Sequence, residues 1–554
     1  MEITRERSSA LHSRADVLCE RSAADRLDWL IAFVLFVFTV VYLSAFLRYS
    51  VLEPDEGIVL EGAQRILDGQ LPYRDFFSFY TPGSFYFVAG LFRVFGDSFA
   101  VARFSILIIG AVFPVLTFSF ARRGCSRGMA VFVALLTVLA GAYRFLVLHN
   151  WYSTFLACLA FYALLEMLET HRPVWAFATG SLCALTTLVE QSKGAGLCLG
   201  LVLGFWTVRF AQRKRLFRGS EWAGFFAGFA WPFLLVAGYF GAKHSLAIML
   251  NDWVWPLRHY GLSNHVRYGY QNWSDYSRGV IFRTGPAWAI AVKVLIVSSG
   301  FVVPVLPFLA VGSYAYGLQQ LRRGTEYPQR WAYQTVSSSA LIGLLLSIVL
   351  SRADIIHFMY LIPLWLVPIA WTLDVSNLSS GLLLRCRTCL IAFLAVSFGL
   401  MGLAMLSTAT GAHAELATRR GVIKTNKTDN VISYVTAYNA PGQAMLVYPY
   451  LPLYYYLTGT RSLARLDYFQ PGMNTTKQAE EILASLGTHP DAPVLFEPAF
   501  LAKIGTSWPG TPIGDIARDP LGDYIARTYK VCGLLHSASD SLFEYMVRSD
   551  RKCP

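Results

Sequence analysis

Long apolar runs separated by short polar stretches fill most of the chain before residue 409. A helix that crosses a membrane needs about 20 predominantly apolar residues. With a window of about nineteen residues, the pattern predicts eleven such helices, at Leu30–Leu47, 99–120, 129–147, 152–169, 174–190, 195–210, 222–242, 287–318, 332–350, 357–373 and 389–408. No small-residue cleavage site follows the first run, so we expect it to remain as a span. The chain is therefore predicted to be a polytopic α-helical membrane protein.

The polar stretch after the first run, residues 48–98, is predicted to carry two helices at the membrane surface. Pro54 suits the first turn of a helix, apolar residues recur at helical spacing in Val59–Leu67, and Gly69 is placed to end it. We expect this first helix to be amphipathic and to lie along the membrane. Ser84–Phe95 is apolar but too short to span, so it is predicted to be a second helix at the interface.

The last stretch has the mixed polarity of an ordinary folded domain. Ala444–Tyr450 and Pro493–Glu497 are typical of buried strands and Thr476–Leu486 of a helix, which indicates a small α/β domain. The predicted organisation is a cytoplasmic segment at 1–29, a transmembrane domain at 30–408 with a first external loop at 48–98, and an extracytoplasmic domain at 409–554.

Arginine and lysine are concentrated on alternate loops. The predicted cytoplasmic loops hold Arg122, Arg123, Arg127, Arg172, Arg209, Arg213, Lys214, Arg215, Arg218, Arg322, Arg323, Arg330, Arg385 and Arg387. The short loops on the other side hold only Arg144, Lys193 and Arg352. Because short cytoplasmic loops are enriched in Lys and Arg, we expect the N-terminus in the cytoplasm and the C-terminal domain outside the inner (plasma) membrane.

Composition narrows the possible partners. Hydrophobic residues make up 55% and charged residues 15% of the chain, and the mean hydropathy is +0.44, which excludes an ordinary soluble domain. The net charge of +12 is spread over separate loops and forms no continuous footprint, so no nucleic-acid partner is expected. Of nine cysteines, only Cys532 and Cys553 are expected in an oxidising compartment, which predicts a disulfide between them. No Cys/His cluster has metal-ligand spacing, and no metal or other cofactor is predicted.

Three acids open the first external loop: Glu53, Asp55 and Glu56. Asp55 and Glu56 fall in the first turn of the predicted helix, where the helix dipole favours the ionised form. An ionised carboxylate is what a base needs to deprotonate an acceptor hydroxyl. Glu53 precedes Pro54 and is expected to be a solvated acid outside the helix. The alternative is a solvated loop whose acids only cap the helix.

Further ionisable side chains lie close to apolar spans. The candidates for substrate binding are Tyr73, Arg74 and Asp75 in the first loop, Lys193 with its neighbour Glu190, and Arg352, Asp354 and His357. A charge near the membrane core costs roughly 2.5–3.5 kcal/mol on insertion scales, so such residues tend to face a cavity with a partner. For Arg352, Asp354 and His357, an internal Arg/Asp pair and a phosphate-binding role remain equally open.

An outward loop at 243–285 is rich in aromatic residues: Trp253, Trp255, Tyr260, Tyr268, Tyr270, Trp273 and Tyr276. Aromatic residues at this level usually form an interfacial belt. The alternative is a platform for sugar rings or for a lipid tail.

Four stretches carry a family resemblance: PDEG from Pro54, GQLPYRDF from Gly69, YTPGSFYF from Tyr80, and RADIIHFMYLIPL from Arg352. Together they resemble the multi-spanning glycosyltransferases of the GT-C fold. The closest group is the glycosyltransferase family 39-like branch, which includes protein mannosyltransferases and the aminoarabinose transferase of lipid A. The resemblance implies that the Asp-Glu pair opening the first external loop is catalytic, that the donor is a sugar on a polyprenyl phosphate, and that no metal is needed.

The resulting hypothesis is an inverting glycosyl transfer at the extracytoplasmic face. Asp55 would accept the acceptor's proton, Glu56 would orient Asp55 or the sugar, and Lys193 and Arg352 would hold the donor phosphate. The acceptor is open among lipid, glycan and protein. Two alternatives are a polymerase or ligase that uses a polyprenyl-diphosphate donor, and a flippase or transporter of lipid-linked sugars.

Overall fold

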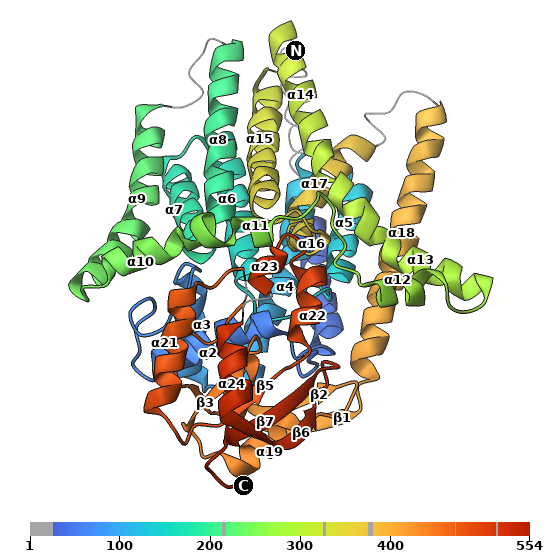
Figure 1. The fold of residues 1–554 in the computed structure, drawn as a ribbon. Coiled ribbons are helices and arrows are strands. Elements are labelled where there is room, and N and C mark those ends of the chain that lie inside the picture. Colours follow the sequence, from blue (N-terminus) through green and yellow to red (C-terminus); the bar gives the residue numbers. More distant parts are fainter. Residues whose placement is uncertain (1–25, 213–217, 325–327, 375–380, 471, 517–518) are drawn as a thin grey trace, which may run out of the picture.

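The computed structural model describes residues 26–212, 218–324, 328–374, 381–470, 472–516 and 519–554. Residues 1–25 of the predicted cytoplasmic segment lie outside the described residues. The same is true of Arg213, Lys214 and Arg215 in one of the predicted cytoplasmic loops. Figure 1 shows a helical bundle at one end and a smaller domain with a sheet at the other. The blue helices of the first external loop lie between these two parts (Figure 1).

Within the described residues, eight helical stretches are long and apolar enough to cross a membrane. Seven of them are Arg26–Ser44, α4 (Phe99–Arg122), α6 (His149–Thr170), α8 (Gln191–Gln212), α9 (Gly219–Ala242), α15 (Pro328–Ser351) and α18 (Gly381–Thr410). The eighth, Ala287–Arg323, is made of three consecutive elements: α13 (Ala287–Val302), η2 (Val303–Val305) and α14 (Pro307–Arg323). The other three predicted spans coincide with the shorter apolar helices α5 (Arg127–Ala140), α7 (Pro173–Val189) and α17 (Ile362–Leu373). The polytopic helical membrane fold predicted from hydropathy is thus confirmed.

Small residues let the bundle helices pack closely. A Cβ atom added to Gly343 of α15 would lie 2.0 Å from the carbonyl oxygen of Gly196 of α8, and one added to Gly200 would lie 2.3 Å from the Ser339 carbonyl. Backbones can approach this closely only where side chains are absent, which is a common basis of helix association in membranes. Lys193 lies in the first turn of α8, and Arg352 directly follows the end of α15, which packs beside the start of α8 through Gly196 and Ser347.

The first external loop contains α2 (Pro54–Leu67) and α3 (Gly83–Phe95), close to the predicted helices. Gly69, with φ of +86°, follows α2 as expected for a helix stop. The predicted helix α2 is present, but it is not exposed on the side away from the bundle as a surface helix would be, because α20 (Leu453–Thr458) of the C-terminal domain packs on it. A Cβ atom on Gly57 would lie 2.1 Å from the Leu453 nitrogen, and even Glu61 is buried.

The aromatic mid-chain loop forms α10 (Leu246–Trp253), η1 (Pro256–Tyr260), α11 (Gly261–Asn264) and α12 (Asp275–Phe282). Its first aromatic residues pack onto the first external loop. The Trp255 ring lies 5.2 Å from that of Phe77, and the Tyr260 ring lies 5.8 Å from that of Phe79. This half of the loop therefore covers the first external loop, in addition to any place in an interfacial belt.

The C-terminal domain is built on a five-stranded mixed sheet in the order β4-β3-β5-β7-β6. Its strands are β3 (Ala444–Tyr448), β4 (Arg461–Ser462), β5 (Val494–Phe496), β6 (Tyr529–His536) and β7 (Leu542–Arg548), and β1 (Ala414–Thr418) and β2 (Gly421–Thr425) form a separate hairpin. Besides α20, the helices of this domain are α19 (Val431–Tyr438), α21 (Thr476–Thr488), α22 (Phe500–Ser507), α23 (Ile513–Ile516) and α24 (Pro520–Thr528). The short helix α16 (Ile355–Tyr360) belongs to the bundle and precedes α17. The predicted strands, the predicted helix and the Cys532–Cys553 disulfide are confirmed.

Candidate active site

Asp55 lies in the first turn of α2, where Pro54 begins the helix and Glu53 is the N-cap residue. Its side chain is 40% exposed. The Tyr450 hydroxyl donates a hydrogen bond to Oδ1 at 2.9 Å, and Oδ2 lies 3.7 Å from Arg144 Nη2. No donor among the described residues lies within hydrogen-bond distance of Oδ2. Asp55 thus presents one carboxylate oxygen that can accept a proton from a bound hydroxyl.

Glu56, the next residue, is held entirely inside the protein. Arg103 of α4 donates to both of its oxygens, at 2.6 and 2.7 Å, and the Val147 amide donates at 2.9 Å. The exposed fractions of the Glu56 and Arg103 side chains are 0% and 1%. A two-pronged Arg–carboxylate contact is geometrically specific, so this ion pair fixes the first turn of α2 against α4.

Glu53 is not the solvated acid that the sequence predicts. Arg144 Nη2 donates to its Oε1 at 2.7 Å, and Arg144 Nε donates to the Tyr360 hydroxyl at 3.1 Å. Burial raises the pKa of Glu53, as do the charges of Asp55 and Glu56, while Arg144 opposes the shift. Arg144 was expected only as an external-loop cation, yet it joins the first loop to α16.

Four tyrosines from three segments are close enough to feel the charge of Asp55, and Tyr450 is the one among them that hydrogen-bonds to it. Burial raises the pKa of Tyr80, Tyr260, Tyr450 and Tyr468, to about 12 for Tyr260, and the charge of Asp55 raises each further. These phenols are therefore neutral at physiological pH and can act as hydrogen-bond donors. Neutral aromatic groups around a carboxylate suit the binding of an uncharged hydroxyl compound.

The predicted Glu190–Lys193 group is a closed cluster. Lys193 Nζ contacts Glu190 Oε2 at 2.9 Å, Ser153 Oγ at 2.8 Å, and the Asn150 carbonyl and Thr154 Oγ1 at 3.1 Å. An ammonium group has three hydrogens, and here it has four partners. Lys193 can therefore act on a nearby phosphate through its charge more readily than through a direct hydrogen bond.

Arg352 and Asp354 form the internal Arg/Asp pair that was one of the two alternatives, and His357 contacts the same carboxylate. Arg352 Nε donates to Asp354 Oδ2 at 2.6 Å, and His357 Nδ1 lies 2.6 Å from Asp354 Oδ1. Burial alone would raise the pKa of Asp354, but the charges of His357 and Arg352 lower it well below its usual range. Arg352 also donates to Asn264 Oδ1 at 3.2 Å and to the Ser507 carbonyl. His357, 27% exposed, presents the accessible side of this group.

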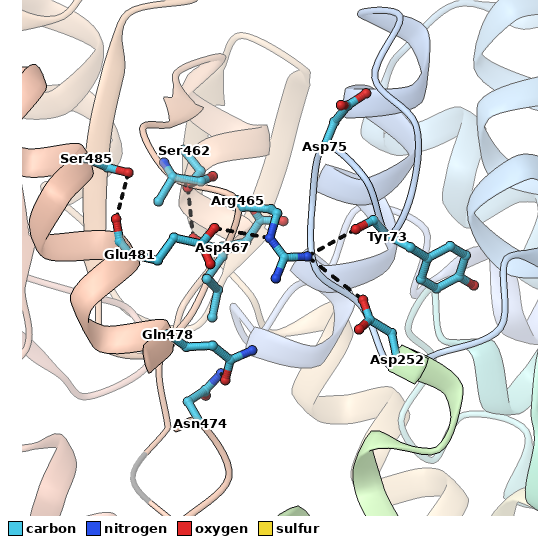
Figure 2. A network of polar contacts seen from close by, with 12 residues as sticks. Tyr73, Asp75, Asp252, Ser462, Arg465, Asp467, Asn474, Gln478, Glu481 and Ser485 are labelled. Carbon is cyan, nitrogen blue, oxygen red and sulfur yellow. Dashed lines mark hydrogen bonds and ion pairs between the residues drawn. The ribbon is translucent and has the colours of Figure 1, made fainter. Parts of the chain in front are cut away.

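Tyr73 is buried at the junction of three segments. Its hydroxyl donates to the Tyr80 carbonyl at 2.8 Å and accepts from Trp253 Nε1 at 2.9 Å. Figure 2 shows the Tyr73 carbonyl and Asp252 beside Arg465 of the C-terminal domain. Arg465 Nη1 donates to that carbonyl at 3.1 Å, and its Nε lies 3.1 Å from Glu481 (Figure 2).

Arg74 and Asp75 belong to the same junction. Arg74 Nη2 lies 2.7 Å from Asp75 Oδ2, which also accepts from the Leu71 amide at 2.7 Å. Arg65 of α2 donates to the Asp75 carbonyl at 3.0 Å. No contact among the described residues joins Arg74 or Asp75 to Asp55, so a substrate-binding role for them stays a prediction.

Three residues that contact the acids of the first loop, Arg103, Arg144 and Tyr450, were not predicted as site residues. Two of them have a feature in the sequence that could have identified them. Arg103 is a cation inside a predicted span, which calls for a nearby carboxylate, and Arg144 is one of only three cations in the short external loops. Tyr450 closes a predicted buried strand and gave no signal of its own. Among the described residues, no group of three or more His, Cys, Asp or Glu side chains could hold a metal ion.

An apolar groove opens among α3, α4, α6, α7 and α9, with a volume of about 1200 Å³. Most of its lining residues are apolar, and they include Pro82, Tyr152 and Val189. Tyr152 and Val189 directly adjoin Ser153 and Glu190 in the sequence, so part of the groove lies beside the Lys193 cluster. Such a groove at the level of the membrane helices fits a hydrocarbon chain.

The fold of the chain is that of membrane proteins with the GT-C fold. The structure is similar to that of ArnT from Cupriavidus metallidurans bound to undecaprenyl phosphate, with a TM-score of 0.52 and 13% identity over 95% of this chain and 98% of that one. It is also similar to ArnT from the same organism in the apo state, with a TM-score of 0.55 and 13% identity over 93% of this chain and 97% of that one. The Archaeoglobus fulgidus oligosaccharyltransferase in complex with Zn and sulfate aligns with a TM-score of 0.50 and 14% identity, over 92% of this chain and 72% of that one. No protein-family model and no curated protein matches the sequence. At these identities the likeness establishes the fold.

Proposed function

We propose that the protein is an inverting glycosyltransferase of the inner membrane that moves a sugar from a polyprenyl phosphate to an acceptor hydroxyl on the extracytoplasmic face. The observation that carries the proposal is Asp55, a partly exposed carboxylate with one oxygen bonded and the other open, at the junction of the bundle and the C-terminal domain. The bound lipid of the ArnT structure with the same fold, undecaprenyl phosphate, supports the choice of donor.

In this mechanism the open oxygen of Asp55 takes the proton of the acceptor hydroxyl. The acceptor oxygen then bonds to the anomeric carbon from the face opposite the phosphate, and the bond from that carbon to the phosphate oxygen breaks with its electron pair. Polyprenyl phosphate leaves with the added negative charge. Cations held in a water-poor site stabilise that charge most in the transition state.

The other predicted residues receive distinct roles. Glu56 orients Asp55 by anchoring the first turn of α2 to Arg103. His357 is the accessible group that contacts the donor phosphate, and Arg352 and Lys193 add positive charge from within their buried clusters. The polyprenyl tail lies in the apolar groove, whose lining residues Tyr152 and Val189 are sequence neighbours of the Lys193 cluster. No metal takes part in these steps.

The test uses Asp55→Asn, which keeps the shape of the side chain and removes its charge. Membranes containing the protein are supplied with polyprenyl-phosphate sugars labelled in the sugar, and transfer of label out of the donor lipid is measured. A general base is worth about 10²- to 10⁴-fold in rate, so transfer should fall by that factor while the donor lipid still co-purifies. The matched control is Asp68→Asn, which alters an exposed acid at the other end of α2.

Two results would contradict the proposal. Near-normal transfer by Asp55→Asn would show that Asp55 is not the base. Mass spectrometry that finds a diphosphate-linked glycan in the purified protein, in place of a polyprenyl phosphate, would favour the ligase alternative.

A further inference from the structure

The C-terminal domain reaches the first external loop through Tyr450, which lies between β3 and α20 and is 395 positions from Asp55 in the sequence. Its hydroxyl donates to Asp55 Oδ1 at 2.9 Å. Aromatic neighbours from the same domain fix the ring: Tyr468 at 5.0 Å, Trp508 at 5.7 Å and Phe500 at 6.0 Å between centroids. Packed aromatic rings leave little rotamer freedom, so the hydroxyl is held at one place.

The hydroxyl is a permanent donor at this position. Burial and the charge of Asp55 raise the pKa of Tyr450 well above its ordinary value, so the phenol keeps its proton at neutral pH. The Asp55 oxygen must therefore be the acceptor. A hydrogen bond to an ionised carboxylate is among the stronger kinds in proteins.

The second oxygen of Asp55 is within ion-pair distance of Arg144 but accepts no hydrogen bond from it. Arg144 Nη2 lies 3.7 Å from Oδ2 but only 2.7 Å from Glu53 Oε1, so Glu53 takes its hydrogen bond. The two Asp55 oxygens thus differ: Oδ1 is engaged by the C-terminal domain, and Oδ2 is available.

We propose that Tyr450 is a positioning residue for Asp55: its hydroxyl fixes Oδ1 so that Oδ2 faces the acceptor hydroxyl. The inference rests on the proposed function, in which Asp55 is the base. The acceptor's proton moves to Oδ2 as the acceptor oxygen bonds to the anomeric carbon, and the Tyr450 proton stays on the phenol throughout. The external domain therefore completes the reaction site contributed by the first loop.

The test is a double-mutant cycle with Tyr450→Phe and Asp55→Asn. Small displacements of a catalytic group cost on the order of 100-fold, so Tyr450→Phe should lower kcat by roughly 10- to 100-fold with little change in the donor KM. In the Asp55→Asn background it should cause no further loss, because its effect passes through Asp55. The control is Tyr438→Phe, which removes an exposed hydroxyl at the end of α19 in the same domain and should leave kcat within about twofold.

Thermal unfolding of each variant in detergent shows whether a loss of rate comes from misfolding. A wild-type rate in folded Tyr450→Phe, or an equal loss in both backgrounds, would overturn this proposal while leaving Asp55 as the base. Normal transfer by Asp55→Asn alone would overturn the proposed function, and this inference with it.

Discussion

Asp55 and Glu56 are neighbours in the first turn of α2, yet their carboxylates face opposite surroundings. Asp55 is 40% exposed and is touched by a single hydrogen-bond donor of the described chain, Tyr450. Glu56 is 0% exposed and accepts three hydrogen bonds, two of them from Arg103. Successive residues on a helix point in directions about 100° apart, so one faces the junction of the two parts and the other faces α4.

The difference shows that two adjacent acids can have separate roles, one as a base and the other as an anchor of the helix. A base has to be reachable and to keep an oxygen free, whereas an anchor has to be buried and fully paired. The sequence motif shows two equivalent acids, and only the surroundings separate them. Substitutions that remove one charge at a time should therefore affect different quantities.

The largest effect on stability is expected from Glu56→Gln. The change leaves the Arg103 guanidinium buried without its counter-charge, and breaking a buried ion pair in this way costs roughly 3–5 kcal/mol. Thermal or chemical unfolding in detergent should show the loss, and the rate per folded molecule should also fall, because the turn that carries Asp55 loses its anchor. The double variant with Arg103→Met should recover much of the stability, because it removes the buried charge that Glu56→Gln leaves unpaired. A stable Glu56→Gln protein with no transfer would place Glu56 in the chemistry instead.

A smaller effect, on rate, is expected from Glu53→Gln. Removing the Glu53 charge frees Arg144, 3.7 Å from Asp55, to bond Oδ2. A hydrogen bond to a charged group contributes about 1.5–3 kcal/mol, so transfer should slow by about tenfold as Arg144 competes for the proton-accepting oxygen. Adding Arg144→Met should restore part of the rate. An unchanged rate in the single variant would show that Arg144 does not move toward Asp55.

The smallest effect concerns a third kind of carboxylate, Asp252, which is buried but incompletely paired with Arg465 at 3.9 Å (Figure 2). Burial raises the pKa of Asp252 to about 6, against about 3.9 in an unfolded chain. Between those values the folded protein binds more protons than the unfolded chain, so stability falls as the pH rises through about 4 to 6. Asp252→Asn should flatten this part of the curve of melting temperature against pH. The same slope in the variant and in wild type would rule out the assignment, and Asp68→Asn serves as the exposed control.

Much of the fold follows from local sequence signals. Apolar runs predict membrane helices because hydropathy depends only on the residues of the run itself. Pro54 marks the start of α2, and Thr475 and Gln478 form a capping box at the start of α21. Both helices therefore begin close to the positions that the sequence predicts. The burial of α2 could not be predicted, because the element that covers it, α20, lies almost 400 residues further along the chain.

The site was predictable only in part, for the same reason. Asp55 was identified from a helix start and a family-like motif, both of which are local. Arg103 and Arg144 were visible as isolated cations, but their partners Glu56 and Glu53 are 47 and 91 positions away. Tyr450 lies next to a buried strand, and a tyrosine at such a position is usually part of the hydrophobic core. Nothing in the neighbouring sequence shows that its hydroxyl contacts a carboxylate of the first loop.

The Tyr450–Asp55 contact has a consequence for biosynthesis. Ribosomes make the chain from its N-terminus, so Asp55 emerges 395 residues before Tyr450. During most of translation the first loop is already in place while the residue that contacts its carboxylate does not yet exist. A growing chain would then hold an unassembled site, and the protein would become able to react only late in synthesis, once the last domain has folded against the first loop.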